Sequence, residues 1–505
     1  MPRFLLSLPL ILLFTGIASL AMLVPAGYAL KLNDHHDARA FLYAAIIGLV
    51  LTALVAVALA GREHNRNPLR QLLALLLGYI LLPAILAIPF HEAVRTTSFL
   101  NAYFEMVSAL TTTGATLFDP ARLSGAEHLW RALVGWLGGL LLWIAASAIL
   151  APLTLGGFEV TAVSEPGQAA APGAAHRDQS DPRQRLARAV AALVPVYAML
   201  TGALFVLLAV AGERPFVALC HAMSVMATSG ISPVGGIARS EAGLGGEVIV
   251  FCFLLFALSR LTFSNDTSAA RRTGLWYDPE FRMGLMITIL VPSALFLRHW
   301  LASFEVGEEE DLIAAFRAFW GAVFTTLSFL TTTGFESVDW ARAQNWSGLD
   351  TPGLILMALA VTGGGVATTA GGVKLLRVFI LYLNGRRELE KLIHPSSVGR
   401  SGLLSRRTRR EGAFIAWVFF MIFALTVTGT VLALSLTGVR FEPAFVLSAA
   451  MLTNTGPLVT FATEMPIQIA QMADSTKALL CAAMVLGRLE VLAIVAMITP
   501  ELWRD

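Results

Sequence analysis

Apolar runs long enough to cross a lipid bilayer are the feature that most constrains the fold of this 505-residue chain. A membrane-spanning helix needs about 20 predominantly apolar residues. Hydrophobic residues make up 56% of the chain and charged residues only 14%, whereas soluble domains carry about 25% charged residues. We place ten spans at about 4–30, 39–60, 71–90, 131–153, 189–211, 246–263, 283–301, 353–383, 411–436 and 477–499. The sequence therefore predicts an all-α integral membrane protein.

The distribution of basic residues predicts the orientation of these spans. We interpret the N-terminal apolar run as a retained first helix, because it is too long for a typical signal peptide. Loops that share a side with the N-terminus are rich in arginine and lysine, with eight such residues in 385–410. The opposite side carries the acidic run "EVGEEED" at 305–311. By the positive-inside rule, we expect both termini to be cytoplasmic.

Four semi-polar segments lie between pairs of spans. Each contains a short apolar run, then hydroxyl or amide side chains, and then a glycine. They are "FEMVSALTTTGATLFD" at 104–119, "LCHAMSVMATSGISPVGG" at 219–236, "WGAVFTTLSFLTTTGFESVD" at 320–339 and "FVLSAAMLTNTGPLVT" at 445–460. One threonine before glycine is common at a helix C-terminus, but four copies in the same setting indicate an internal repeat. The predicted fold has four pseudo-repeated helix–pore loop–helix units around one central pore, plus an N-terminal helix pair.

The repeats divide the chain into predicted regions that share one plan, separated by two cytoplasmic linkers. These are the N-terminal helix pair at 1–62, pore repeat 1 at 63–154, a cytoplasmic linker at 155–188, pore repeat 2 at 189–270, pore repeat 3 at 271–384, a basic cytoplasmic linker at 385–410 and pore repeat 4 at 411–505. The first linker is rich in alanine, proline and glycine, a composition typical of a flexible connection.

The polar turns have the chemistry of a site for a monovalent cation. Irregular backbone at membrane depth must be buried in protein or line a water-filled cavity, and the C-terminal end of a short helix favours a cation beyond it. Four extended segments around an axis would make rings of carbonyl oxygens that replace the hydration shell of an ion such as K⁺. No carboxylate of the kind that divalent ions prefer lies in the turns. Glu336 and Asp339 follow the third turn and are expected at the outer mouth. The candidate ion-binding residues are Thr112, Thr113, Gly114, Thr228, Ser229, Gly230, Thr332, Thr333, Gly334, Asn454, Thr455 and Gly456.

With these motifs the chain resembles the TrkH/TrkG branch of the Trk/Ktr/HKT superfamily of potassium uptake proteins over nearly its whole length. Further supporting motifs are "TGGGVATTAGGVKLLRV" at 362–378, "KLIHPSSV" at 391–398 and "GRLEVL" at 487–492. Glycine in all four turns implies, by this resemblance, selectivity for K⁺. The resemblance also implies a bacterial inner-membrane location, a homodimer and a cytoplasmic nucleotide-binding regulator of the TrkA type. This partner would dock on 154–188 and 385–410, and any nucleotide would be bound by it, because we expect this chain to bind no cofactor.

A glycine-rich interruption of the eighth span is a candidate gate. Five glycines among residues 363–372 disfavour a straight helix, although small residues also permit close helix packing. The resemblance implies an intramembrane gating loop at 362–373, and it implies that Arg488 projects into the pore as an electrostatic barrier. A charge within the membrane is costly and usually functional, and we expect Lys374 to anchor the loop or to pack between helices. The candidate gating residues are Gly363, Gly364, Gly365, Thr368, Thr369, Gly371, Gly372, Lys374 and Arg488.

Two other classes of function are weighed against an ion pore. A secondary transporter that couples ions to a small organic substrate would explain the interrupted span, but such transporters usually have two-fold repeats and this chain has four. An enzyme is not expected, because we find no catalytic constellation. His91 and Glu92 lack the second histidine that a zinc-protease motif requires. The chain has no basic domain that would indicate nucleic-acid binding.

Overall fold

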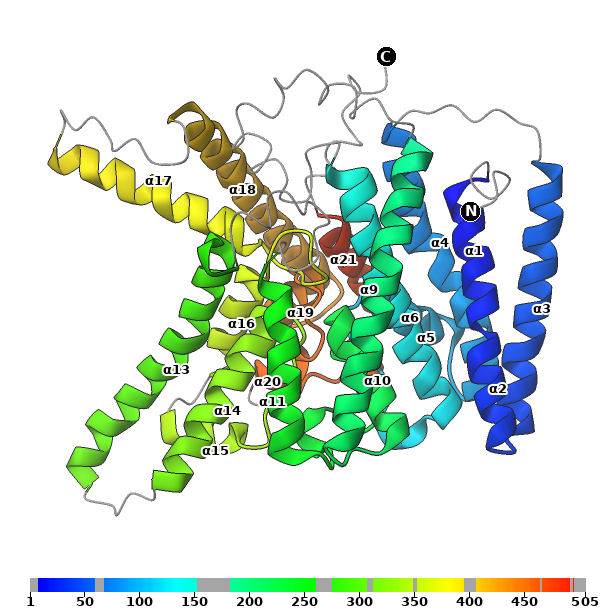
Figure 1. The fold of residues 1–505 in the computed structure, drawn as a ribbon, viewed down its shortest axis with the longest axis horizontal. Coiled ribbons are helices and arrows are strands. Elements are labelled where there is room, and N and C mark those ends of the chain that lie inside the picture. The colour runs from blue at the N-terminus through cyan, green and yellow to red at the C-terminus, as the bar shows by residue number, and fades with distance from the viewer. Residues whose placement is uncertain are drawn as a thin grey trace.

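The computed structural model describes residues 8–59, 68–151, 182–259, 275–306, 312–347, 352–394, 406–463, 466–490 and 494, and these residues form helices and turns with no strand. Most of the predicted linker at 155–188 and part of the basic linker at 385–410 lie outside the described residues. The helices gather into one bundle, with the N-terminal pair at one side and the helices of the third repeat at the other (Figure 1).

The N-terminal pair consists of α1 (Leu10–Ala21) and α2 (Leu23–Lys31), which together run as one span, followed by α3 (His35–Ala58). Asp34 caps α3, and its side chain accepts hydrogen bonds from the backbone amides of His36 and Asp37 at 3.2 Å. Such a cap satisfies amides that have no partner within the helix. Helix α3 exposes a long apolar face, including Leu54 at 62% exposure, as expected of a helix long and apolar enough to cross a membrane.

Each of the four repeats contains an incoming helix, a short pore helix and an outgoing helix. The repeats are α4 (Pro68–Val94), α5 (Phe99–Leu110) and α6 (Gly125–Ala145); α9 (Pro182–Val210), α10 (Pro215–Ala227) and α11 (Gly243–Leu254); α13 (Pro279–Val306), α14 (Leu312–Leu330) and α16 (Gly353–Thr362); and α18 (Arg406–Leu436), α19 (Phe441–Leu452) and α21 (Asp474–Leu489). Two further helices, α15 (Trp340–Ser347) and α20 (Leu458–Phe461), follow the third and fourth pore helices, and α17 (Leu375–Ile393) follows α16.

Eight helices of the described residues are long and apolar enough to cross a membrane. Over the described residues, the predicted spans at 246–263, 353–383 and 477–499 contain shorter helices, since α11 ends at Leu254, α16 at Thr362 and α21 at Leu489. Residues 260–263 and most of 491–499 lie outside the described residues. In contrast, the third predicted half-crossing segment, 320–339, begins within residues 313–330, which form a helix of spanning length. The break that the glycines predict within 353–383 is observed, since residues 363–374 separate α16 from α17.

The pore helices occupy the centre of the bundle. Residues 104–110 of α5, 222–227 of α10, 324 and 327–330 of α14, and 446–452 of α19 are buried. The outgoing helix α6 is also largely buried, whereas α9, α13 and α18 expose apolar side chains. Short helices surrounded by longer ones place the polar turns that follow them inside protein and away from lipid, which is where irregular backbone is tolerated.

Candidate functional site: four polar turns and the loop next to them

The pore helices end in four similar turns, which we call the polar turns and which comprise residues 112–114, 228–230, 332–334 and 454–456. The first residue of each has a left-handed backbone conformation, with φ of +55° at Thr112, +48° at Thr228, +57° at Thr332 and +54° at Asn454. This conformation reverses the chain after the helix and is uncommon for residues other than glycine. All twelve residues of the polar turns are buried or nearly so.

The amides of the polar turns are bonded to their own pore helices. Thr113 and Gly114 both donate to the carbonyl of Ser108, at 2.8 and 3.3 Å, and Thr333 and Gly334 donate to Ser328 at 2.9 and 3.2 Å. In the second repeat Ser229 donates to Ser224 at 2.9 Å. These N–H groups donate to carbonyls of the preceding pore helix, so hydrogen bonds hold each turn at the C-terminal end of its helix. The partial negative charge of the helix lies at that end.

The four glycines meet around one axis. An added Cβ atom on Gly114 would overlap the carbonyl of Ser229, and one on Gly230 would overlap the carbonyl of Thr333. A Cβ on Gly334 would come within 2.9 Å of the Pro457 ring, and one on Gly456 would overlap the backbone of Ala115. Each glycine therefore faces the turn of the next repeat, in the cyclic order one, two, three, four, one. The predicted convergence of the four segments is observed.

The fourth turn differs from the other three in its backbone. Gly114, Gly230 and Gly334 have φ of +74°, +66° and +79°, whereas Gly456 is not among the residues with positive φ. Pro457 follows Gly456, and a proline restricts the residue before it to extended conformations. The amide of Gly456 donates a 2.6 Å hydrogen bond to the carbonyl of Thr113, in the neighbouring turn. Gly456 therefore does not share the positive φ of the other three glycines.

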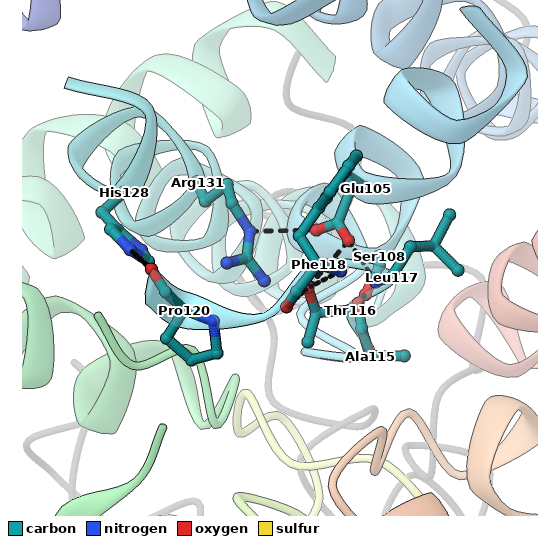
Figure 2. A network of polar contacts seen from close by, with 9 residues as sticks. All are labelled: Glu105, Ser108, Ala115, Thr116, Leu117, Phe118, Pro120, His128 and Arg131. Carbon is teal, nitrogen blue, oxygen red and sulfur yellow. Dashed lines mark hydrogen bonds and ion pairs between the residues drawn. The ribbon is translucent and has the colours of Figure 1, made fainter. Parts of the chain in front are cut away.

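A buried ion pair supports the segment that follows the first turn (Figure 2). One carboxylate oxygen of Glu105 on α5 accepts bonds from the amide of Leu117 at 2.5 Å and the hydroxyl of Thr116 at 2.8 Å. The other oxygen lies 2.9 Å from Nε of Arg131 on α6, and both side chains are at most 5% exposed. Neither residue stands out in the sequence, because a lone glutamate in an apolar helix gives no local signal of its partner.

A second buried carboxylate supports the segment after the third turn. Glu247 of α11 accepts bonds from the amide of Val338 at 2.6 Å, the hydroxyl of Ser337 at 2.9 Å and the indole N–H of Trp320 at 2.9 Å. Of the two carboxylates predicted at the outer mouth, Asp339 pairs with Arg342 at 2.9 Å. Burial raises the pKa of Glu336, while the charge of Arg239 opposes that rise.

The glycine-rich loop 363–374 lies against three of the four polar turns. The amide of Gly371 donates to the hydroxyl of Thr332 at 2.7 Å, and the hydroxyl of Thr228 donates to that of Thr369 at 3.1 Å. A Cβ on Gly371 would overlap the carbonyl of Thr453, next to the fourth turn. Gly371 and Thr369 are among the gating residues predicted from the sequence, but their contact with the turns is visible only in the structure.

Residues from several helices hold this loop. Trp143 of α6 donates through Nε1 to the carbonyl of Ala367 at 2.9 Å, and Glu280 of α13 accepts from the amide of Val366 at 3.0 Å. Arg488 of α21 donates through Nη1 to the carbonyl of Thr369 at 2.8 Å. Lys374 donates to the carbonyl of Ala370 within the loop itself.

A small cavity of about 30 Å³ borders the loop. It is lined by Leu142, Ala146, Leu150, Ala367, Thr368, Ala370, Gly371, Gly372, Lys374, Asn454, Gly487, Arg488 and Glu490. Glu490 pairs with Arg377 at 2.6 Å, so the nearby acid is bonded to α17. Gly363 and Gly364 pack against residues 370–372 of the same loop. The amide of Gly365 donates to the carbonyl of Ala257 at 3.0 Å. No group of three histidine, cysteine, aspartate or glutamate side chains is placed to hold a metal among the described residues.

Comparisons with known proteins agree with this architecture. Residues 248–503 match the TrkH family, which is described as cation transport proteins. The chain is 30% identical to the Trk system potassium uptake protein TrkH of Vibrio parahaemolyticus, with 98% of each chain covered. It is also 30% identical to the protein of that name from Escherichia coli K12, again with 98% of each chain covered. The crystal structure of the potassium transporter TrkH from V. parahaemolyticus superimposes with a TM-score of 0.78 at 28% identity and covers 99% of this chain and 100% of that one. This chain therefore belongs to the TrkH family of membrane cation transport proteins.

Proposed function

We propose that this chain carries K⁺ into the cell through the ring formed by the four polar turns. The observation that carries the proposal is the cyclic contact of the four glycines, each against the turn of the next repeat. The relatives that cover nearly the whole chain are named potassium uptake proteins. A ring of neutral oxygens is the chemistry that suits K⁺, and the turns contain hydroxyl, amide and carbonyl oxygens without a carboxylate. Cyclic four-fold contact is not expected of an ion-coupled transporter built from two-fold repeats.

In this mechanism the ion exchanges water for protein oxygens at the centre of the bundle. The C-terminal ends of the four pore helices place partial negative charge beside the turns. Carbonyl groups of the twelve polar-turn residues, helped by the threonine hydroxyls, would coordinate the ion. Asn454 supports this arrangement, because its amide nitrogen donates to the hydroxyl of Thr113 at 2.9 Å and to the carbonyl of Met484 at 3.0 Å.

The loop 363–374 serves in this proposal as the gate of the pore. Its bonds to Thr332 and Thr228 place it against the turns, and the bond from Arg488 to Thr369 holds it there. Opening would break these bonds and move the loop aside. The guanidinium of Arg488 would also repel cations next to the turns, because charge acts strongly where water is excluded. Lys374 would act as an internal anchor through its bond to Ala370.

A cytoplasmic nucleotide-binding regulator of the TrkA type would control this gate from the basic face. Helix α17 leads directly from the loop and extends away from the bundle (Figure 1). Its last turns expose both charge and apolar surface, with Arg386 and Lys391 exposed and Leu389 and Leu392 at 62% and 79% exposure. A surface of this kind fits a protein partner. We further propose that the chain forms a homodimer in a bacterial inner membrane and that both of its termini are cytoplasmic. Each chain would be divided into the helix pair, four pore repeats and two linkers predicted from the sequence.

Growth and flux measurements test this function. The intact protein, expressed with its regulator in a bacterium that lacks K⁺ uptake, should restore growth at low K⁺, and the purified chain in liposomes should carry K⁺. Gly334→Ser should abolish rescue, because a Cβ at this φ of +79° would press on the Pro457 ring. Failure of the intact pair to rescue growth, with protein present in the membrane, would contradict K⁺ uptake and favour an organic substrate coupled to ions.

A further inference from the structure

The pore-helix residue nine positions before each turn glycine is polar in three repeats and apolar in the fourth. These residues are Glu105, His221, Thr325 and Leu447. All four are buried, with at most 1% exposure. The residue six positions before the glycine follows the same division, with Ser108, Ser224 and Ser328 in the first three repeats and Ala450 in the fourth. Buried polar groups need hydrogen-bond partners. The polar side chains of the first three pore helices therefore require partners, and the apolar ones of the fourth do not.

In each of the first three repeats the polar residue binds the segment that follows the glycine, which we call the post-turn segment. Glu105 binds Thr116 and Leu117, as described above. Nε2 of His221 lies 2.8 Å from the hydroxyl of Ser232, and the amide of Ser337 donates to the hydroxyl of Thr325 at 3.3 Å.

The serines six positions before the glycine add contacts in two of these repeats. Ser108 donates to the carbonyl of Ala115 at 2.6 Å, and the hydroxyls of Ser224 and Ser229 are 3.2 Å apart. In the first repeat the post-turn segment is thereby joined to its own pore helix at Ala115 and again at residues 116–117. In the second repeat Ser224 contacts the turn itself and His221 binds the post-turn segment. In the third repeat the bond from Ser337 to Thr325 joins the segment to its pore helix.

The fourth post-turn segment has a different structure. Leu447 and Ala450 carry no polar side-chain atoms, so they offer it no hydrogen bond. Residues 458–461 form the helical turn α20, and the hydroxyl of Thr460 is bonded within the segment, to Pro457 at 2.6 Å. The Pro457 ring lies between two other turns, since a Cβ on Gly230 would come within 2.8 Å of it and one on Gly334 within 2.9 Å. The second and fourth repeats face each other across the ring, so Pro457 narrows the space that the ion must cross.

We propose that Glu105, His221 and Thr325 are positioning residues that fix the carbonyl oxygens of three turns, and that the fourth post-turn segment, which lacks this anchor, is the mobile part of the ring and sets its ion selectivity. This inference rests on the proposed K⁺ pathway. In the position observed here, Gly456 bonds the carbonyl of Thr113 and Pro457 lies against Gly230 and Gly334. Movement of residues 456–461 outward frees the Thr113 carbonyl for the ion.

Two substitutions to valine at the same position of two repeats test the role of the anchor. Thr325→Val removes the hydroxyl acceptor and keeps the shape of the side chain, whereas Leu447→Val changes an apolar residue that bonds nothing. In liposomes we expect Thr325→Val to raise the ratio of Na⁺ to K⁺ flux by about 2- to 10-fold, the range that corresponds to one lost hydrogen bond. Leu447→Val should leave the ratio at the wild-type value. An unchanged ratio in Thr325→Val, or an equal change in both variants, would overturn the inference.

Amide hydrogen exchange on the full chain in lipid nanodiscs provides a second measurement that does not depend on transport. The amides of residues 458–462 should exchange faster than those of 117 and 337–338, because only the latter segments are bonded to buried side chains. Thr325→Val should accelerate exchange at Ser337 and Leu447→Val should not. Equal protection of all the post-turn segments would overturn the inference even if the wild-type protein carries K⁺. If the wild-type protein carries no K⁺, the proposed function is refuted. The exchange pattern would still show whether the fourth post-turn segment is more mobile than the other post-turn segments.

Pro457→Ala tests the fourth segment directly. Removing the ring from between Gly230 and Gly334 should change the ratio of Na⁺ to K⁺ flux by at least the factor seen for Thr325→Val. A ratio equal to that of the wild type would show that Pro457 does not set selectivity and would overturn that part of the inference.

Discussion

The polar turns and the loop 363–374 lie against each other but are held in different ways. Each turn is bonded mainly by its own pore helix, as when Thr113 and Gly114 donate to Ser108. The loop is held by residues from other helices, among them Trp143 of α6, Glu280 of α13 and Arg488 of α21. A part held by its own helix keeps its shape when neighbouring helices move, whereas a part held by several helices responds to the movement of any one of them. This difference is what the proposed roles require, namely selection of an ion by the turns and gating by the loop.

The largest effect is expected from a change that alters the geometry of the turns. Gly230→Ala would force an L side chain into φ of +66° and push its Cβ into the Thr333 carbonyl. The left-handed conformation alone costs about 1–2 kcal/mol, and with displacement of the carbonyl we expect K⁺ flux in liposomes to fall by at least about 30-fold. Gly202→Ala is the control, because a Cβ there meets nothing within 4 Å. Flux that survives in Gly230→Ala would contradict a ring that depends on this turn.

Shortening the loop should raise K⁺ flux, whereas the change in the turn lowers it. Deletion of residues 364–371 removes the segment that contacts Thr228, Thr332 and Thr453. If these contacts keep the pore closed most of the time, their loss should raise K⁺ flux in the absence of a regulator by about tenfold, a shift typical of a two-state equilibrium. The flux must remain selective for K⁺ over Na⁺. Unchanged flux, or a leak without selectivity, would show that the loop is a structural part of the ring and not a gate.

Removing one charged contact to the loop should have a smaller effect than removing the loop. Arg488→Ala abolishes the bond to Thr369 and the positive charge beside the turns. We expect K⁺ flux to rise about fivefold, equivalent to about 1 kcal/mol, because the other contacts still hold the loop. Arg488→Lys keeps the charge and should stay closer to the wild type if repulsion of the cation dominates. Arg39→Ala, at an exposed position of α3, is the control. A rise of the same size in Arg39→Ala would assign the effect to general surface charge.

Much of the arrangement of the turns could be predicted from sequence, because the repeat itself carries the information. Four glycines in equivalent units predict four segments that meet, and the threonine-rich turns at 111–114 and 331–334 have matching backbone conformations. The different backbone conformation of the fourth turn could also have been predicted, because Pro457 follows its glycine in the sequence. Aligning the four glycines would also have exposed the series from Glu105 to Leu447. This alignment is the signal that could have identified the anchors.

The contacts that hold the loop could not be predicted in this way. Trp143 and Ala367 are 224 positions apart in the chain, and Arg488 is 119 positions from Thr369. No periodicity or motif connects such residues, because their contact depends on how the repeats pack around the axis. The sequence indicated that Arg488 lies within the membrane, but not that its partner is a loop carbonyl. Similarly, Glu247 lies in the second repeat and supports the segment after the third turn, which no single repeat reveals.

The smallest effect, and the sharpest test of how the loop is held, is expected from two tryptophans on α6. Trp143→Phe removes the indole N–H that bonds Ala367 at 2.9 Å, whereas Trp136→Phe removes one that bonds the hydroxyl of Thr201 at 2.9 Å, away from the loop. Both rings pack against Tyr197, at 5.5 and 5.1 Å between centroids, so the two substitutions cost similar packing. A neutral hydrogen bond at the weak end of its range, about 0.5 kcal/mol, corresponds to about a twofold change in an equilibrium. We expect K⁺ flux to rise by that factor in Trp143→Phe alone. Equal flux in the two variants would mean that α6 does not hold the loop, and the loop would then depend on α13 and α21 for its position.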